Sequence, residues 1–331
     1  MAVYRLGDLV RECKQKIDRS SNPYEYYIAG EHMESNRLRI VHRGRFADSD
    51  VGPAFVRLFK PGQVLYGSRR TYLKKVAVAD FEGVTSNVTF VLETRDENVL
   101  PQRLLPFVLL SDRFTAYSIG KSKGSTNPYV LFSDLADFEI DLPSIDKLRE
   151  IESIMCASEN LKEHYRSLIE ACNDLVKSRF IEMFGDPSDN PFDWPARKLS
   201  TIGSLRNGVN FKANDKGFEI RSLGVSDFKD RSEIHDMELI SKVEMSNPPR
   251  PTQLLQDGDV VFVRSNGNKE LVGRCLAVYP GETPLTFSGF CISFRNETPS
   301  LALGYLLGFF KAQSTREKMG SSVVSVGEIP A

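Results

Sequence analysis

The hydrophobic and polar positions of this chain form two similar stretches, separated by a long helical pattern. Residues 60–68 and 256–264 each contain a polar turn around a glycine, Gly62 or Gly258, followed by an apolar run typical of a strand. Three further pairs of segments recur in the same order: 6–9 with 199–202, 104–110 with 301–307, and 123–125 with 319–321. The offsets stay between about 193 and 198 residues. This regularity predicts a duplicated domain.

The first stretch, residues 1–142, alternates short apolar runs with polar turns, which predicts a mixed α+β domain. Strands are expected at residues 64–66, 75–78 and 88–92. The apolar residues of 100–117 predict one helix, which residues 111–114 continue into a surface turn.

Residues 143–184 predict a single long helix. Pro143 and Ser144 supply a start signal, and Ile145 is the first residue expected to be helical. Steps of three and four then follow at Ile151, Ile154, Ser158, Leu161, Tyr165, Leu168, Cys172, Leu175 and Arg179, with polar lapses at Ser158 and Arg179. This spacing is a heptad seam. A helix of about 39 residues is roughly 58 Å long, longer than a domain is wide. It therefore needs a partner helix, from this chain or another, unless it lies along one domain.

Residues 185–187 end the helix, and a proline-rich connector follows at 187–196. The second copy stops at residues 326–331, the equivalent of the final strand of the first copy, and the second long helix expected next is not present. The predicted organisation is a first domain at 1–142, a spacer helix at 143–186, and a second, incomplete domain at 187–331.

Composition limits the possible functions. The chain has 331 residues, is 41% hydrophobic and 26% charged, and suits two globular domains. Five cysteines without C-x-x-C spacing and only four histidines argue against a zinc site and a disulfide framework, and favour a reducing cytoplasm. There is no signal peptide pattern, and the most apolar window, residues 301–310, is about half of a membrane span. We expect a cytoplasmic protein with no membrane contact.

Two strings resemble the adenine-binding loop of amino-methyltransferases. Residues 127–129 read Asn-Pro-Tyr and residues 247–250 read Asn-Pro-Pro-Arg, but neither matches fully and no glycine-rich cofactor turn accompanies them. Turns explain both strings better. A phosphate-binding loop and a nuclease cluster of carboxylates with lysine are also missing from the sequence. We therefore expect no catalytic residues, no cofactor and no metal in this chain.

The charge distribution leaves room for DNA binding. The net charge is −1, but residues 1–132 carry 20 Lys and Arg against 14 Asp and Glu. A basic face on the first domain and an evenly mixed surface are both compatible with these numbers. DNA reading uses Arg and Lys for phosphates and guanine, and Asn or Gln for adenine.

Candidate DNA-binding residues occur in both copies. In the first they are Arg37, Arg39, Arg43, Arg45, Arg69, Arg70, Lys74, Lys75, Lys121, Lys123 and Asn127. In the second they are Arg206, Asn207, Asn210, Lys212, Arg264, Asn266, Asn268 and Lys269. The run at 264–269 follows an apolar strand and aligns with residues 68–70 of the first copy. Matched positions favour a pair of recognition loops, although for each single residue a solvated surface role remains the simpler alternative.

One family fits this organisation. The strand Ile140-Asp141-Leu142-Pro143, the long helix, and the phrase at 180–186, Phe-Ile-Glu-Met-Phe-Gly-Asp, lead into a second domain. This pattern resembles the specificity (S) subunit of Type I restriction–modification systems, over essentially the whole chain. The missing second helix is the departure.

The resemblance implies a non-catalytic protein that takes part in DNA methylation and phage defence. Two target-recognition domains would read the two halves of a bipartite site in double-stranded DNA. The helix pair would act as a ruler between them and would dock methyltransferase (M) and restriction/translocase (R) subunits. The helix interface would use Ile151, Ile154, Leu161, Tyr165, Leu168 and Leu175. A second copy, or a helix supplied in trans, would replace the missing helix.

Two other functions remain open at this point. One is a two-domain protein-interaction scaffold that dimerises through its helix without reading DNA. The other is a fragment of a fused methyltransferase–nuclease, against which the start of the chain directly in the first domain argues.

Overall fold

The computed structural model describes residues 2–212, 215–228, 231–267 and 271–321. The chain divides into two compact units, Met1–Ser167 and Leu168–Ala331, which we call unit 1 and unit 2. The division falls inside one continuous helix, α5 (Ile145–Phe184). Helix α5 therefore contributes residues to both units. The single long helix expected from residue 145 is confirmed, and mixed α+β units on both sides of it confirm the predicted fold class.

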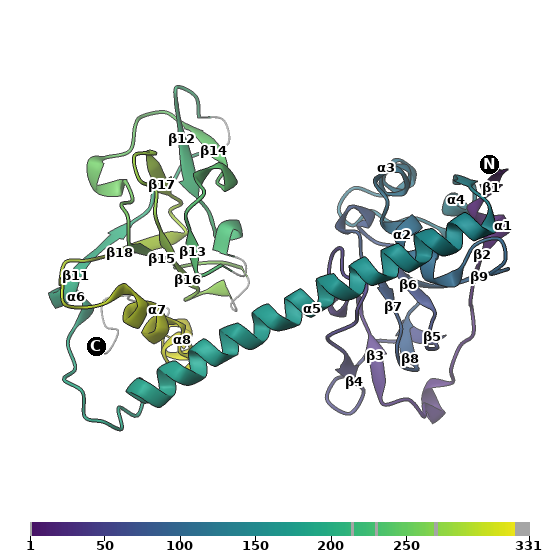
Figure 1. Ribbon diagram of the computed structural model, residues 1–331, viewed down its shortest axis with the longest axis horizontal. Helices are drawn as coiled ribbons and strands as arrows, with labels where there is room; N and C mark the ends of the chain where they lie inside the picture. The colour runs from purple at the N-terminus through teal and green to yellow at the C-terminus, as the bar shows by residue number, and fades with distance from the viewer. Residues whose placement is uncertain (1, 213–214, 229–230, 268–270, 322–331) are drawn as a thin grey trace. The chain divides into compact units, whose positions relative to one another are not determined.

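Unit 1 is built on two four-stranded sheets and a two-stranded ladder (Figure 1). The sheet orders are β2-β9-β6-β7 and β4-β3-β8-β5, and β1 pairs with β10. Its strands are β1 (Ala2–Arg5), β2 (Val10–Glu12), β3 (Tyr26–Ile28), β4 (Gly44–Arg45), β5 (Phe55–Phe59), β6 (Val64–Gly67), β7 (Val76–Val78), β8 (Gly83–Ser86), β9 (Thr89–Thr94) and β10 (Glu139–Leu142). Its helices are α1 (Leu6–Leu9), α2 (Leu105–Leu110), α3 (Asp112–Lys121), α4 (Phe132–Ala136) and the first part of α5. The three strands predicted from the sequence correspond to β6, β7 and β9.

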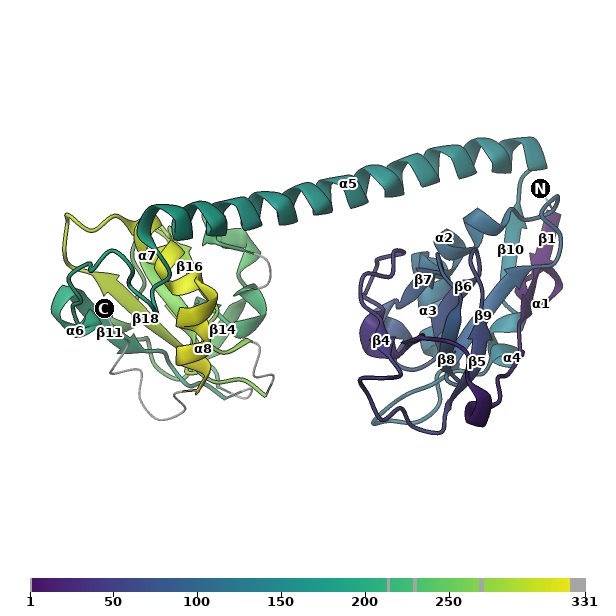
Figure 2. The same ribbon diagram turned by 90° about the horizontal axis from the view of Figure 1, so that it is seen from below.

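Unit 2 contains a five-stranded sheet of order β11-β18-β15-β16-β13 and a three-stranded sheet of order β14-β12-β17. Its strands are β11 (Gly203–Asn207), β12 (Phe218–Leu223), β13 (Glu233–Ile234), β14 (Lys242–Met245), β15 (Asp259–Val263), β16 (Cys275–Val278), β17 (Leu285–Phe287) and β18 (Cys291–Asn296). Its helices are α6 (Leu199–Ile202), α7 (Leu303–Lys311) and α8 (Gln313–Ser321). Helices α7 and α8 cover one face of the larger sheet (Figure 2), where Phe262, Phe294 and Phe310 pack together.

The two units repeat one topology. The order β2-β9-β6-β7 in unit 1 corresponds to β11-β18-β15-β16 in unit 2. In the smaller sheets, β3 pairs antiparallel with β4 and parallel with β8, and β12 pairs in the same two ways with β14 and β17. Mixed pairing of this kind in the same strand order does not arise from local sequence preferences. The structure therefore confirms that the mixed fold is duplicated.

The glycine turn that first indicated the duplication has the same geometry in both units. Gly62 and Gly258 have φ of 85° and 82°, a left-handed conformation that favours glycine. Before each strand, the amide of Lys60 donates to Gln63 Oε1 at 2.7 Å, and the amide of Gln256 donates to Asp259 Oδ2 at 2.8 Å. The side chain at the first position after glycine closes the turn in both copies.

Only part of the predicted correspondence is in register. Val64 pairs with Leu92 in unit 1, and Val260 pairs with Phe294 in unit 2. Val64 therefore corresponds to Val260, and Leu92 corresponds to Phe294. Unit 2 therefore has six more residues between these two strands than unit 1. A constant difference in residue number consequently no longer matches equivalent positions after these strands. The pairing of residues 123–125 with 319–321 is wrong, because α8 runs through Ser321 whereas Gly124 lies in a loop after α3.

The single helix predicted at residues 100–117 is also wrong. The chain forms α2 and α3 with a break at Ser111, whose ψ of 148° is extended. The Ser111 hydroxyl accepts a hydrogen bond from the amide of Phe114 at 3.2 Å and so caps α3. Unit 2 has the same break at Ala312, between α7 and α8. Residues 111–114, predicted as a surface turn, begin a second helix.

Helix α5 ends where the sequence predicted. Gly185 has φ of 78° and its amide donates to the carbonyl of Ile181 at 2.8 Å, a glycine cap. At its other end, Leu148 is buried in the core of unit 1 and Ile151 packs against the same core. Phe180 packs on unit 2, with its ring centroid 5.6 Å from that of Tyr305. The two ends of α5 are therefore packed into different units.

Candidate nucleic-acid interface

The loop after β15 in unit 2 is held by its backbone and by one arginine. The amide of Arg264 donates to the carbonyl of Phe290 at 2.8 Å. Its guanidinium donates to Asn207 Oδ1 at 2.9 Å and to the carbonyl of Gly289 at 2.8 Å. The structure thus brings together Arg264 and Asn207, two predicted candidates from distant parts of the sequence, at the ends of β15 and β11, the two strands that flank β18 in the sheet.

The loop after β6 in unit 1 has the same backbone attachment but different side chains. The amide of Ser68 donates to the carbonyl of Val88 at 3.1 Å, the equivalent of the Arg264–Phe290 bond. Arg69 and Arg70 follow with exposed side chains, and Arg70 has a left-handed φ of 51°. The predicted alignment of residues 68–70 with the loop after β15 is therefore confirmed as a structural position. That either loop reads DNA stays a prediction.

A second segment of unit 1 lies against this loop. The amide of Arg70 donates to the carbonyl of Pro128 at 2.7 Å, and Lys123 and Tyr129 exchange two backbone hydrogen bonds of 2.8 and 2.9 Å. Arg69, Arg70 and Lys123 are therefore neighbours, although more than 50 positions separate them in sequence. Lys121 lies at the end of α3, with its Nζ 5.4 Å from the ring centre of Tyr117.

Several other candidates are engaged in ion pairs. Lys74 Nζ lies 2.6 Å from Asp112 Oδ1, and this hydrogen bond and charge lower the pKa of the Asp112 carboxyl. Lys123 Nζ lies 2.8 Å from Asp134 Oδ2. Both lysines are less available to phosphate than the sequence indicated, because a ligand must compete with a carboxylate.

Arg37 is a candidate that the structure removes from the DNA-binding set. Arg37 is 7% exposed and is bound to Glu163 of α5, whereas Arg45 pairs with Glu25 but has an exposed side chain and stays a candidate. A buried arginine that is surrounded by carboxylates has no free donor for DNA. The sequence suggested otherwise because it shows charge without showing burial.

The remaining candidates of unit 2 are dispersed. Arg206 is next to Asn207 in β11, so the two side chains point to opposite faces of the sheet, and Arg206 donates to Ser204 Oγ at 2.8 Å. Lys212 lies with Arg250 in the lining of a cleft of about 470 Å³, formed in part by residues 247–250. Those residues form a loop between β14 and β15, as the turn interpretation predicted. Asn266 is half-buried, and Asn268 and Lys269 lie outside the described residues.

Sequence reasoning missed the aromatic residues at these loops. Phe290 is 59% exposed beside Arg264, and Tyr72 and Tyr129 are exposed beside Arg69 and Arg70. An aromatic ring in a polar loop was the available signal, because bases stack on such rings. Exposed aromatic rings therefore accompany the arginines of the loops in both units.

Helix α5 carries an apolar face in its middle. Five of the predicted seam residues are more than half exposed: Ile154, Leu161, Tyr165, Leu168 and Leu175. Ile151, the sixth, packs against the core of unit 1 instead. A neighbouring row with the same seven-residue spacing was missed; it consists of Ile169, Val176 and Met183, also more than half exposed. The two rows together make the face wider than a two-position seam.

The described residues, 2–212, 215–228, 231–267 and 271–321, hold neither a metal-binding cluster nor a membrane-spanning helix. Within them, no group of three or more His, Cys, Asp or Glu side chains is placed to hold a metal ion. No helix in the same ranges is long and apolar enough to cross a membrane.

Comparison with known proteins gives one curated relative and several solved structures. No protein-family model matches the chain. The Type I restriction enzyme EcoDI specificity subunit of Escherichia coli is 20% identical over 184 residues, which cover 54% of this chain and 40% of that protein. The chain thus matches less than half of the length of that relative.

The solved structures cover more of the chain. The HsdS subunit from Thermoanaerobacter tengcongensis is 18% identical, with 99% of this chain and 83% of that chain covered and a TM-score of 0.43. A Type I restriction–modification S subunit from M. genitalium is 14% identical, with the same coverage and a TM-score of 0.49. The curated match is to a specificity subunit, in agreement with the expected non-enzymatic role. The resemblance predicted from the phrase at residues 180–186 is therefore confirmed, and this chain is similar to the specificity subunits of Type I restriction enzymes.

Proposed function

We propose that this chain is a non-catalytic DNA-specificity subunit of a restriction–modification system, with one reading domain in each unit. The proposal rests mainly on the duplicated fold, which presents a polar loop at the same strand end in both copies. A duplicated reader suits a target whose two halves are separate. The domains would cover residues 1–142 and 187–331, with residues 143–186 as the spacer helix.

The two loops would read different bases because their side chains differ. Arg69 and Arg70 suit guanine edges, whereas Asn207 and Asn266 suit adenine. Arg264 is committed to Asn207 and Gly289, so it would fix the shape of its loop as well as contact DNA. Lys121 and Lys123 would contact phosphates, which position the protein without selecting a sequence.

The exposed face of α5 would bind a partner helix. Its apolar side chains extend from Ile154 to Met183 and are more than half exposed, so burying them against another helix would remove a large apolar area from water. We propose that this face pairs with a second copy of the chain or a helix supplied in trans. The assembled helices would dock methyltransferase subunits and, in the complete enzyme, the restriction subunit.

Methylation mapping tests the two-reader arrangement. Cells would carry the chain with its methyltransferase, and methylated sequences would be determined across the genome. We expect Arg69→Ala or Arg70→Ala to relax one half of the target, and Asn266→Ala to relax the other, by about 1–3 kcal/mol of discrimination each. Lys121→Gln is the matched control, since loss of a phosphate contact weakens all sequences alike.

Two results would contradict the proposal. If variants of both loops altered the same half of the target, the two units would not be separate readers. If no duplex bound to the assembled complex, α5 would be the main functional element, and a protein-interaction scaffold would be the better description.

A further inference from the structure

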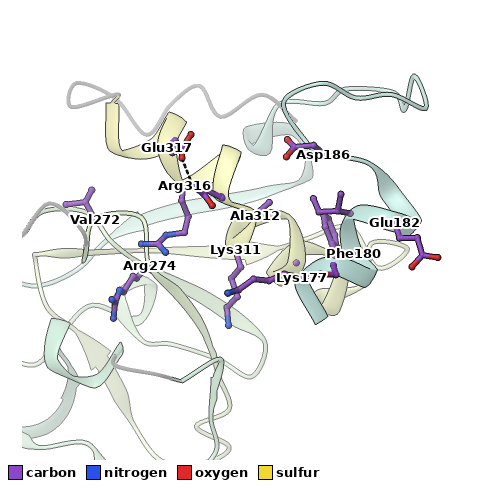
Figure 3. Close-up of a pocket in the computed structure, with 14 residues that line it drawn as sticks. Lys177, Phe180, Glu182, Asp186, Val272, Arg274, Lys311, Ala312, Arg316 and Glu317 are labelled. Atoms are coloured by element: carbon purple, nitrogen blue, oxygen red, sulfur yellow. Dashed lines mark hydrogen bonds between the residues drawn. The ribbon is translucent and has the colours of Figure 1, made fainter. Parts of the chain in front are cut away.

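Unit 2 contains a cleft of about 1000 Å³ that the reading loops do not explain (Figure 3). The end of α5 forms one wall, α7 and α8 form another, and the hairpin between β15 and β16 forms the third. Each of these elements supplies one cation: Lys177, Lys311, Arg316 and Arg274. Four cationic side chains from four elements therefore line one hollow.

The acidic residues of the cleft have hydrogen-bond partners of their own. Glu182 binds Arg179 at 2.6 Å, Asp186 accepts hydrogen bonds from Ser188, and Glu317 accepts one from Gln313 at 2.9 Å. Figure 3 shows Asp186 and Glu317 in the upper part of the view and Glu182 at its right, whereas Lys177, Lys311 and Arg274 lie lower and to the left of Glu182. Lys177, Lys311 and Arg274 are thus separated from these carboxylates, whereas Arg316 lies beside Glu317.

The lower part of the cleft has an excess of positive charge. Lys177 pairs with the exposed Asp174 of its own helix at 3.0 Å, a contact that water screens. Among the residues that the structure describes, neither Lys311 nor Arg274 has a carboxylate within ion-pair distance. Burial lowers the pKa of Lys311, and the nearby charge of Lys177 lowers it further, against the opposing charge of Glu233. An anion placed between the two ammonium groups would relieve this repulsion.

The cleft and the proposed reading loop are connected by one position of the pairing between the end of β15 and the residue just before β16. The amide of Val263, the residue before Arg264, donates to the carbonyl of Arg274 at 2.9 Å, and the amide of Gly273 donates to the carbonyl of Val263 at 2.9 Å. A duplex whose bases lay at the loop after β15 would therefore have this hairpin, which carries Arg274, beside it.

We propose that this cleft binds phosphate groups of the DNA backbone, through Lys177 and Lys311 with Arg274. This inference rests on the proposed function. It gives the end of α5 a direct part in DNA binding, because Lys177 belongs to that helix. The ammonium group of lysine and the guanidinium group of arginine donate charge-assisted hydrogen bonds to phosphate, and they do so whatever the DNA sequence.

The first experiment measures anion binding by the whole chain with inorganic tripolyphosphate as the probe. Binding is followed by the shift of the melting temperature. We expect at least a fivefold weaker affinity for Lys177→Gln/Lys311→Gln than for the unchanged chain. Lys242→Gln is the matched control, because Lys242 is an exposed lysine of unit 2 that pairs with Glu219. Lys177→Gln alone, at an exposed position, provides the answer if the double variant does not fold.

The second experiment measures DNA affinity of the methyltransferase complex against salt concentration. Each lost phosphate contact lowers the slope of log affinity on log salt by about 0.9, so the double variant should lose about two units, with the methylated sequence unchanged. An unchanged slope would overturn the proposal. Loss of subunit assembly in the double variant, without a change of slope, would also overturn it and would identify an acidic segment of a partner subunit as the occupant of the cleft. A wild-type complex that binds no DNA would instead refute the proposed function.

Discussion

Units 1 and 2 have the same strand order but attach helix α5 in opposite chemical ways. In unit 1, Arg37 Nη2 binds Glu163 Oε2 at 2.9 Å, and both residues are buried, with 7% and 8% exposure. In unit 2, Phe180 of α5 lies over Gly308 of α7 and contacts Tyr305. At unit 1 a buried ion pair adds to the packing of Leu148 and Ile151, whereas at unit 2 an aromatic ring fills a glycine notch.

The same contrast occurs inside the two sheets. Gln63 and Asp259 occupy equivalent positions, and so do Glu93 and Arg295. In unit 1 the Gln63 amide donates to Glu93 at 2.8 Å, whereas in unit 2 Arg295 donates to Asp259 at 2.7 and 2.6 Å. The negative charge has moved to the other strand while the contact between the strands is kept. Duplicated folds therefore retain pairing geometry more strictly than they retain charge.

The largest effect is expected in the middle of α5, where the apolar side chains are exposed and are part of neither unit's core. Leu168 is 57% exposed, so Leu168→Asp should leave the stability of the isolated chain within about 0.5 kcal/mol. In an assembled helix pair the same carboxylate would be buried without a partner, at a cost of several kcal/mol. Loss of co-purification with the methyltransferase measures this effect. Asn173→Asp adds the same charge outside the apolar rows and should leave assembly intact. Unchanged assembly of Leu168→Asp would contradict the partner surface.

The ion pair at unit 1 gives the next effect. Arg37→Met leaves Glu163 buried with only Arg166 as a cationic partner, so we expect a loss of about 3 kcal/mol in the free energy of unfolding of unit 1. Chemical denaturation measures it. Arg113→Met, at an exposed pair with Asp141, is the control and should change little. Equal effects of the two substitutions would mean that burial does not strengthen the Arg37 contact.

The same pair makes the attachment sensitive to acid. Burial raises the pKa of Glu163, but hydrogen bonds from Arg37 and Arg166 and their charges outweigh it, so this pKa lies below its ordinary value. A depressed carboxyl pKa contributes stability above about pH 4.3, and this contribution is lost as the pH falls through the folded-state value. Glu163→Gln should therefore be less stable than the wild type at neutral pH, and the difference should shrink below about pH 4. Denaturation midpoints between about pH 3 and about pH 7 measure this.

The glycine notch at unit 2 gives a smaller effect. A Cβ at position 308 would lie 2.3 Å from Phe180 Cδ2, so Gly308→Ala should displace the ring and cost about 1–3 kcal/mol. Gly304→Ala, on the same helix with nothing within 4 Å, should be neutral or stabilising by up to about 1 kcal/mol. Thermal unfolding of both variants tests the notch. If Gly308→Ala were as stable as Gly304→Ala, Phe180 would not depend on this glycine.

The smallest effect separates the two reading loops. Arg264 and Asn207 share a hydrogen bond, so Arg264→Ala and Asn207→Ala should be non-additive in DNA affinity by about 0.5–1.5 kcal/mol. Arg69→Ala and Arg70→Ala should be nearly additive, because the two exposed side chains share no such bond. A double-mutant cycle at each loop makes the comparison. Coupling at the unit 1 loop, or its absence at the unit 2 loop, would show that the loops do not differ in this way.

Sequence by itself determined the features that depend on local pattern. The glycine turns at Gly62 and Gly258, the strands after them, and the start and end of α5 follow from φ preferences, alternation and capping, which act over a few residues. The phrase at residues 180–186 indicated the family because it is a continuous string of residues, which does not depend on folding to be recognised. The break at Ser111 was accessible in principle, since serine is a helix-capping residue, but the apolar run around it favoured one helix.

Tertiary structure decided what depends on contacts between distant residues. Only folding shows that Arg37 is buried against Glu163, that Arg264 is held by Asn207, and that Lys177 meets Lys311 in one cleft. The two members of each pair lie between 57 and 134 positions apart in sequence. Charge in a sequence is visible, whereas burial and pairing, which decide whether that charge can bind DNA, arise when the sheets and helices pack.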